Sequence, residues 1–138
     1  MAALHARAFA GRGRAWSAEE IAALLENPHV LAVTRPEAFA LARVVADEAE
    51  LLTIATDPDH RRQGLARGVL ASLEHAASQR GAARLFLEVA EDNGPARGLY
   101  AACGFVEIAR RKGYYAAPGG GRVDALLMEK ALVPIPSA

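Results

Sequence analysis

One stretch constrains the fold of this chain more than any other. Between residues 51 and 80, an apolar segment, a basic turn marked by a glycine and a long amphipathic pattern follow one another. The segment LLTIA is typical of a buried strand, and from Leu65 to Arg80 apolar residues recur every three to four positions, which predicts a helix. Gly81 follows where a left-handed C-cap belongs. The sequence therefore predicts a strand, a basic loop and a helix N-terminus in this order.

Helix and strand patterns alternate along the rest of the chain. They predict helices over 2–9, 17–26 and 93–103, and strands over 29–34, 38–46, 49–57, 83–90, 105–110 and 123–132. Ser17 and Glu20 have the spacing of a capping box, which marks the start of the second helix. Residues 111–122 are expected to form a loop between the last two strands. This order of elements predicts one mixed α/β (α+β) domain.

Composition narrows the possible functions. A chain of 138 residues with 52% hydrophobic residues can bury the core of one domain. Its 16 basic residues balance 16 acidic ones, so the excess positive charge typical of nucleic-acid and membrane-surface binders is absent from the sequence. No run approaches the roughly 20 apolar residues of a membrane span, and the N-terminal residues lack the apolar core of a signal peptide. A cytoplasmic location is therefore expected.

Metal and disulfide chemistry are not indicated. Cys103 is the only cysteine, which excludes an internal disulfide, and it fits a small buried residue near a helix end. The four histidines lie too far apart in the sequence for a local metal-ligand signature. No metal site is expected.

The glycine of the basic turn admits more than one interpretation. A helix N-terminus carries free backbone N–H groups and a partial positive charge, and a glycine lets a phosphate approach the backbone closely. A P-loop would need a Gly-Lys-Ser/Thr ending, which this turn lacks. A dinucleotide-binding fold would need three glycines where the chain has Gly64, Ala66 and Val69. From these residues alone, a phosphate site and an ordinary solvated turn both remain open.

Five motifs, in order along the chain, resemble the GNAT superfamily of N-acetyltransferases, which use acetyl-coenzyme A. They are RRQGLA at 61–66, LFLEV at 85–89, EDNGPARGLY at 91–100, CGF at 103–105 and RRKGYY at 110–115. The resemblance implies a mixed, mostly antiparallel central sheet, with helices on both faces and a splayed strand pair that forms the cofactor groove. Within the superfamily, the combination is similar to the bacterial enzymes that acetylate the N-terminal alanine of a small-subunit ribosomal protein.

The resemblance also implies where acetyl-coenzyme A binds. Backbone groups of the strand before the basic loop would hold the pantetheine and the acetyl carbonyl, and the loop with the first helical turn would take the pyrophosphate. Asn93 would contact the cofactor, although a role as helix N-cap accounts for it equally well. The residues expected at the cofactor are Ile54, Ala55, Thr56, Arg61, Arg62, Gln63, Gly64, Leu65, Ala66, Arg67 and Asn93.

Two residues carry the chemistry that the resemblance implies. Glu88 places a charge in an otherwise apolar strand, and the matching glutamate of the related enzymes is the general base that takes the amine proton. Tyr100 follows Asn93 by two helical turns, and its hydroxyl would protonate the departing thiolate. Without the resemblance, Glu88 also fits a solvated strand face and Tyr100 a core position. Because the bound amine attacks the acetyl carbonyl directly, no covalent nucleophile is needed and Cys103 is not a candidate.

Aromatic and basic residues indicate the acceptor side. Trp16, Tyr114 and Tyr115 match segments that wall the acceptor groove in the family, and the run from Arg110 to Lys112 could attract acidic peptide side chains. Trp16 also fits a core residue at a helix start, and the basic run also fits a solvated loop. Related chains have a strand before the first helix, so this sheet is expected to lack or shorten one edge strand.

Three functions from different classes follow. The favoured one is acetylation of a protein N-terminus, with a ribosomal protein as partner. The others are acetylation of a small-molecule amine, which the basic and aromatic acceptor segments disfavour, and non-catalytic binding of acyl-coenzyme A, which needs no Glu88 or Tyr100. We expect one domain over 1–138, with acceptor-side helices in 1–27, the cofactor-binding core in 28–132 and a tail in 133–138. It is expected to be a monomer or weak dimer that binds neither nucleic acid nor membrane.

Overall fold

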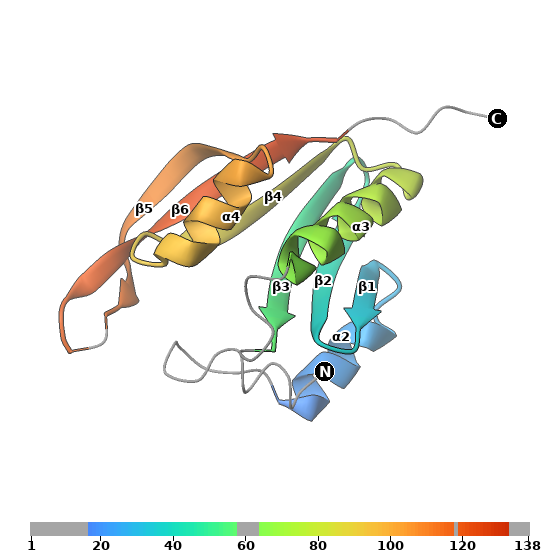
Figure 1. Ribbon diagram of the computed structural model, residues 1–138, viewed down its shortest axis with the longest axis horizontal. Coiled ribbons are helices and arrows are strands. Elements are labelled where there is room, and N and C mark those ends of the chain that lie inside the picture. The colour runs from blue at the N-terminus through green and yellow to red at the C-terminus, as the bar shows by residue number, and fades with distance from the viewer. Residues whose placement is uncertain (1–16, 58–63, 118, 133–138) are drawn as a thin grey trace.

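The computed structural model describes residues 17–57, 64–117 and 119–132 of the chain (Figure 1). The described helices are α2 (Ala18–Glu26), α3 (Leu65–Gln79) and α4 (Gly94–Ala102). The described strands are β1 (Val30–Arg35), β2 (Ala38–Val45), β3 (Glu48–Thr56), β4 (Arg84–Ala90), β5 (Val106–Ala116) and β6 (Arg122–Ala131). The helix predicted over 2–9, and any strand before it, lie outside the described residues.

The described strands form one sheet in the order β1-β2-β3-β4-β6-β5. All neighbours are antiparallel except β3 and β4, which are parallel. The parallel pairing covers only Glu48–Glu50 and Arg84–Phe86, and beyond it the two strands diverge (Figure 1). The predicted mixed, mostly antiparallel sheet with a splayed strand pair is confirmed.

A bulge in β3 accounts for the divergence. Ala42 of β2 pairs with Leu51, and the preceding Leu41 pairs with Thr53, so Leu52 is an extra residue in β3. A bulge bends its strand and increases the local twist. Because Leu52 comes two positions after Glu50, the last β3 residue that pairs with β4, the bend directs the rest of β3 away from β4.

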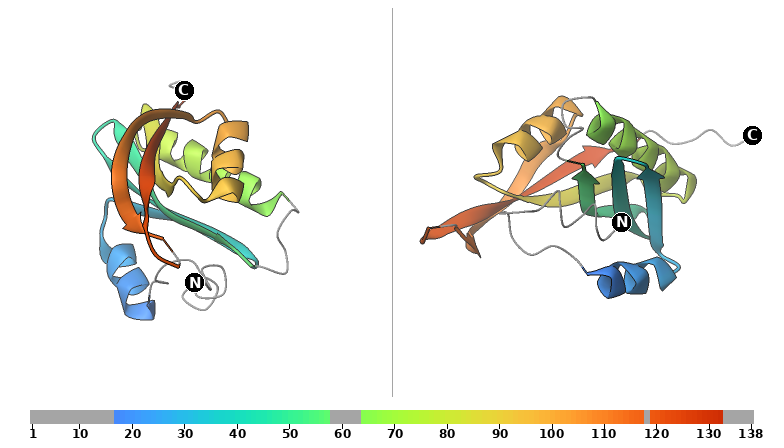
Figure 2. Two further views of the ribbon diagram at one scale, coloured as in Figure 1. Left: turned by 90° about the vertical axis from the view of Figure 1, so that its left-hand side faces the viewer. Right: turned by 60° about the horizontal axis from the view of Figure 1, so that its bottom comes forward.

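Helices cover both faces of the sheet because β2 is apolar on both sides. On one face, Leu70 and Leu73 of α3 are fully buried in one cluster with Leu85 of β4. On the other face, Ile21 of α2 packs in a second cluster with Phe39 of β2. Burial of one such side chain contributes about 1.5–3 kcal/mol, so these two clusters fix the order of the layers. Figure 2 shows α3 and α4 on one side of the sheet and α2 on the other.

The helix boundaries follow the local signals in the sequence. Ser17 Oγ accepts a hydrogen bond from the backbone N–H of Glu20 at 3.1 Å, and Glu20 Oε1 accepts one from the N–H of Ser17 at 3.2 Å, which confirms the capping box. Gly81 follows α3 with φ +95°, which confirms the left-handed C-cap.

The last strand pair is longer than the sequence indicates. The prediction of a loop from residue 111 is wrong, because β5 continues to Ala116. Arg111 pairs with Ala125 and Tyr115 pairs with Val123, so the β5 residues between them oppose Asp124 alone. A bulge of three residues opposite one therefore accommodates the polar, glycine-containing segment within the strand.

Candidate active site

The divergence of β3 and β4 leaves the carboxyl end of β3 paired on one side only. Ile54, Ala55 and Thr56 pair with β2, and their pairing with β4 is absent from the described ladder. Backbone N–H and C=O groups at such a strand edge can bind an extended ligand. Ala55 is 2% exposed and packs on the α2 side, whereas Ile54 packs on the α3 side. This edge therefore lies between the two faces of the sheet and offers mainly backbone groups.

The amino-terminal end of α3 has the features of an anion site. Gly64 is the N-cap residue with φ +74°, in the left-handed region that favours glycine, and it makes no side-chain cap hydrogen bond. The first turn contains no acidic residue, so the N–H groups of Leu65, Ala66 and Arg67, which have no partner within the helix itself, retain their positive potential. The exposed Arg67 donates through Nη2 to the carbonyl oxygen of Ala102 at 3.3 Å, which links the start of α3 to the end of α4. Arg61, Arg62 and Gln63 lie outside the described residues.

Two predicted site residues belong to α4. Asn93 is its N-cap, and the Asn93 side-chain oxygen accepts from the N–H of Ala96 at 3.3 Å. Tyr100 is 6% exposed and meets Phe105 edge-on, with ring centroids 5.7 Å apart. Burial raises the pKa of Tyr100 to about 12, with a smaller contribution from Cys103. The Tyr100 hydroxyl therefore stays protonated at neutral pH.

Glu88 lies on the other face of β4. Its neighbours Leu87 and Val89 are buried in the cluster under α3 and α4, and because strand side chains alternate, Glu88 points to the opposite side. Tyr100 belongs to that same buried cluster. Glu88 comes two positions after Phe86, the last β4 residue that pairs with β3. The predicted base and acid therefore lie on opposite faces of the sheet, and Glu88 lies beside the point where β3 and β4 separate.

The structure places two β5 side chains beside the carboxylate of Glu88, whose side chain is 29% exposed. The Tyr115 hydroxyl donates to Glu88 Oε1 at 2.8 Å, and Arg111 Nε lies 3.8 Å from Oε2. Burial, and then the hydrogen bond to Glu88, raise the pKa of Tyr115. The sequence predicted Tyr115 as a wall of the acceptor groove and missed its contact with Glu88. The glycine at the centre of the β5 bulge hints at an irregular strand, but it does not indicate the contact itself.

The other expected acceptor residues have separate environments. Tyr114 meets Tyr115 edge-on with ring centroids 5.0 Å apart, and the Arg111 guanidinium lies 5.1 Å from the Tyr114 ring centroid. Arg110 lies within 3.1 Å of Glu91 and of Glu107 and within 3.4 Å of Asp124. Arg110 therefore already has acidic partners within the protein, which weakens its expected attraction for acidic peptides. Trp16 lies outside the described residues.

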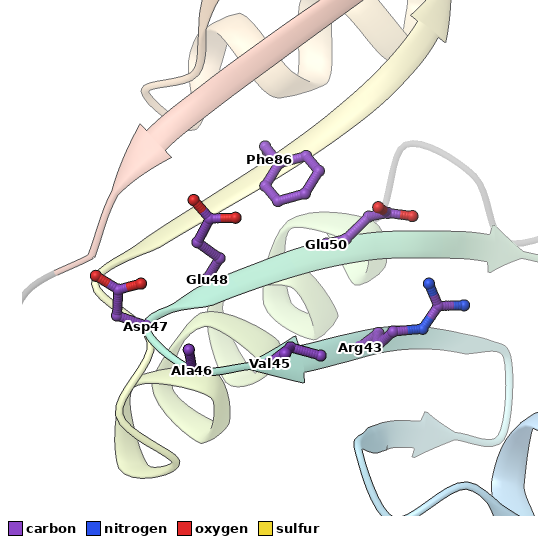
Figure 3. Close-up of a pocket in the computed structure, with 7 residues that line it drawn as sticks. All are labelled: Arg43, Val45, Ala46, Asp47, Glu48, Glu50 and Phe86. Carbon is purple, nitrogen blue, oxygen red and sulfur yellow. The ribbon is translucent and has the colours of Figure 1, made fainter.

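A separate hollow of about 340 Å³ lies where β3 and β4 still pair (Figure 3). In Figure 3 its side chains stand on the side of the sheet away from the helix behind it. None of the predicted site residues lines it. Its lining consists of Arg43, Val45, Ala46, Asp47, Glu48, Glu50 and Phe86. The candidate site is therefore placed at the splay, where the predicted site residues of β3 and β4 lie, and not at this hollow.

Two further features were sought in the described part of the chain. It holds no group of three or more His, Cys, Asp or Glu side chains arranged to bind a metal ion. Among the helices described, none has both the length and the apolar character needed to cross a membrane.

The sequence is similar to that of known acetyltransferases. Residues 5–105 match the model of the acetyltransferase (GNAT) family. The ribosomal protein bS18-alanine N-acetyltransferase of Escherichia coli (strain K12) is 47% identical over 91 residues, which cover 66% of this chain. The same match covers 61% of that relative, less than two thirds of its length.

Solved structures show the same relationship. The crystal structure of the Escherichia coli ribosomal-protein-alanine N-acetyltransferase superposes with a TM-score of 0.84 at 35% identity, over 99% of this chain and 87% of that one. NAA60 of Arabidopsis thaliana in complex with acetyl-CoA superposes with a TM-score of 0.70 at 18% identity, over 84% of each chain. At that identity, the second match shows a shared fold alone.

Proposed function

This chain belongs to the GNAT family of acetyltransferases, and on this premise we propose that it transfers the acetyl group of acetyl-coenzyme A to the N-terminal α-amine of a protein. The proposed acceptor is the alanine N-terminus of a small-subunit ribosomal protein, by analogy with the Escherichia coli enzyme to which the chain is similar. The observation that carries the proposal is the position of Glu88 beside the splay on one face of the sheet, with Tyr100 buried on the opposite face. An acetyl group held between β3 and β4 would be open to a base from one face and to an acid from the other.

The acetyl donor would bind along the splay and the start of α3. Backbone groups of Ile54, Ala55 and Thr56 would hold the pantetheine and the acetyl carbonyl at the strand edge that β4 leaves unpaired. The pyrophosphate would bind the amino-terminal end of α3 at Gly64, an N-cap residue that has no side chain of its own to cap the helix. Arg61, Arg62, Gln63, Leu65, Ala66 and Arg67 complete this proposed site, and Asn93 would contact the donor while it caps α4.

The proposed reaction is a direct transfer. The neutral amine nitrogen attacks the acetyl carbonyl carbon, the C–S bond breaks, Glu88 takes the proton of the amine, and Tyr100 gives its proton to the sulfur. With a Tyr100 pKa of about 12 and a thiol pKa of about 8.5, that last transfer is uphill by roughly 5 kcal/mol in isolation. Tyr100 would therefore hydrogen-bond to the sulfur as negative charge develops there, and would transfer its proton only as the C–S bond breaks.

The wider expectations are part of the same proposal. Residues 1–27, which include Trp16, would form the acceptor side together with Tyr114 and Tyr115. Residues 28–132 would form the core that binds the donor, and residues 133–138 would form a tail. A cytoplasmic location follows if the acceptor is a newly made ribosomal protein. Acetylation of a small amine and non-catalytic binding of an acyl-coenzyme A remain the alternatives that the experiment must separate.

Two peptides separate these alternatives. A peptide that begins with alanine is expected to gain one acetyl group at its α-amine, whereas the same peptide with a blocked N-terminus and an internal lysine is expected to react far more slowly. At pH 7 an α-amine with a pKa of about 7.8 is roughly one-seventh neutral, but a lysine with a pKa of about 10.4 is neutral only about 0.04% of the time. Equal rates would contradict N-terminal specificity, and no transfer to either peptide would favour a small amine or pure binding.

A further inference from the structure

The hydrogen bond between Tyr115 and Glu88 joins residues that are far apart in the sheet register. Glu88 of β4 pairs with Leu127 of β6, but Tyr115 of β5 pairs with Val123, four positions along the same strand. Tyr115 nevertheless places its hydroxyl 2.8 Å from Glu88 Oε1. The hairpin must therefore redirect the tyrosine back towards the base.

The bulge in β5 supplies this change of direction. Gly113, at its centre, has φ +62°, in the left-handed region that other residues adopt at a cost. Its backbone N–H donates to Asp124 Oδ1 at 2.9 Å, and its carbonyl oxygen accepts from Arg122 Nε. Arg122 Nη2 also donates to the carbonyl oxygen of Tyr114 at 3.3 Å. Side chains of β6 thus hold the bulge in one conformation from both sides.

We propose that Tyr115 is a positioning residue for Glu88, and that the bulge held by Asp124 and Arg122 exists to aim it. The inference rests on the proposed function, because it assumes that Glu88 is the base. The phenol donates to one carboxylate oxygen, which restricts rotation of the carboxylate and leaves the other oxygen for the amine. Arg111, 3.8 Å from that second oxygen, is too far for a strong hydrogen bond and leaves room for an acceptor.

Tyr115 is suited to this role across the working pH range. Its raised pKa keeps the phenol protonated, and therefore donating, wherever an α-amine is partly neutral. Its ring is also fixed by the edge-on contact with Tyr114 at 5.0 Å. A base whose position is fixed before the acceptor binds loses less rotational freedom in the reaction, which is the usual benefit of a preorganised site.

A double-mutant cycle tests the inference. Tyr115→Phe keeps the ring and removes the hydroxyl, so kcat is expected to fall roughly tenfold in the wild-type background, as for loss of a hydrogen bond to a charged group. In the Glu88→Gln background, where no carboxylate base remains to be positioned, the same change is expected to leave kcat within about twofold. Tyr114→Phe is the matched control, since that neighbouring hydroxyl does not contact Glu88. Tyr114→Phe is expected to change kcat by the same factor in the wild-type background and in the Glu88→Gln background.

The outcomes distinguish this inference from the proposed function. If Tyr115→Phe lowers kcat by the same factor with and without Glu88, then Tyr115 acts independently, as an acceptor contact, and the inference is overturned. If Glu88→Gln itself leaves kcat unchanged, the proposed base is wrong and the inference falls with it. A second cycle, on the melting temperature without substrates, uses Glu88→Ala in place of Glu88→Gln, because a glutamine amide oxygen could still accept from Tyr115; it reports the hydrogen bond alone. Additive melting shifts there would show that the contact is not made in solution, which would also overturn the inference.

Discussion

Replacing the buried Tyr100 with phenylalanine should separate catalysis from stability. The side chain is 6% exposed, and its hydroxyl has no hydrogen-bond partner among the residues that the structure describes. A buried hydroxyl without a partner costs about 1–3 kcal/mol, so removing it while keeping the ring against Phe105 is expected to stabilise the fold by about 1 kcal/mol. For a domain of this size, that corresponds to a rise in melting temperature of about 4 °C.

Catalysis should move in the opposite direction. If the Tyr100 hydroxyl stabilises the departing thiolate, Tyr100→Phe is expected to lower kcat on the order of 10²-fold. This loss should not recover between pH 6.5 and 9, because the wild-type pKa of about 12 keeps the hydroxyl protonated throughout this range. The assay is thiol release with an alanine-start peptide, alongside thermal denaturation of both proteins.

The pH dependence of stability provides an internal check. The folded-state pKa of about 12 lies above the unfolded value of about 10, so the folded state holds the proton more tightly. Wild type should therefore lose stability as pH rises from about 10 to 12, and Tyr100→Phe should lack this component. Tyr100→Leu, which also removes the ring, should lose both stability and activity. A Tyr100→Phe protein with wild-type kcat would refute the proposed acid role of Tyr100. A Tyr100→Phe protein with a lower melting temperature than wild type would refute the claim that the buried hydroxyl lacks a hydrogen-bond partner.

Two glycines give further predictions. Gly64→Leu should abolish the stabilisation by acetyl-coenzyme A, which is about 2.7 kcal/mol at 100 times the dissociation constant, because a side chain at φ +74° would extend into open space at the helix start. Gly68→Ala, one turn into α3 and equally open, should keep that shift, and its loss would indicate a general defect of the helix. Gly113→Ala meets only ordinary contacts with Arg122 at 3.8–3.9 Å, so its cost is the strained backbone, about 1 kcal/mol. Gly113→Ala should lower kcat as Tyr115→Phe does, while acetyl-coenzyme A still stabilises the protein. An unchanged kcat together with a lost stabilisation by acetyl-coenzyme A would contradict the proposed role of the bulge.

Local signals in the sequence predicted most of the fold. The capping box at Ser17, the apolar spacing after Leu65 and the glycine at Gly81 each act within one or two turns, so they are visible without tertiary context. The loop predicted from residue 111 was wrong because a bulge is defined by the partner strand. The contacts of Gly113 with Asp124 and Arg122 join residues across a hairpin, and the sequence gives no register for them.

The candidate site was predictable by residue type and less so by arrangement. Glu88 stands out as a charge in an apolar strand, and the alternation along β4 already separates it from the face that α4 covers. Tyr100 could not be distinguished from a core tyrosine by pattern, and in the structure it is also a core tyrosine. The approach of Tyr115 to Glu88 depends on the β5 bulge, so only the three-dimensional structure could show it.

The dependence of the Glu88→Gln defect on pH tests the central claim most directly. The measurement is kcat for wild type and Glu88→Gln from pH 6.5 to 9, with an alanine-start peptide and thiol release as the readout. If Glu88 removes the amine proton, the variant should be slower on the order of 10²-fold near pH 7, and the deficit should shrink towards pH 9, where an α-amine with a pKa of about 7.8 is already mostly neutral. A deficit that stays constant across the whole range would contradict the claim and would mean that Glu88 holds the acceptor without deprotonating it.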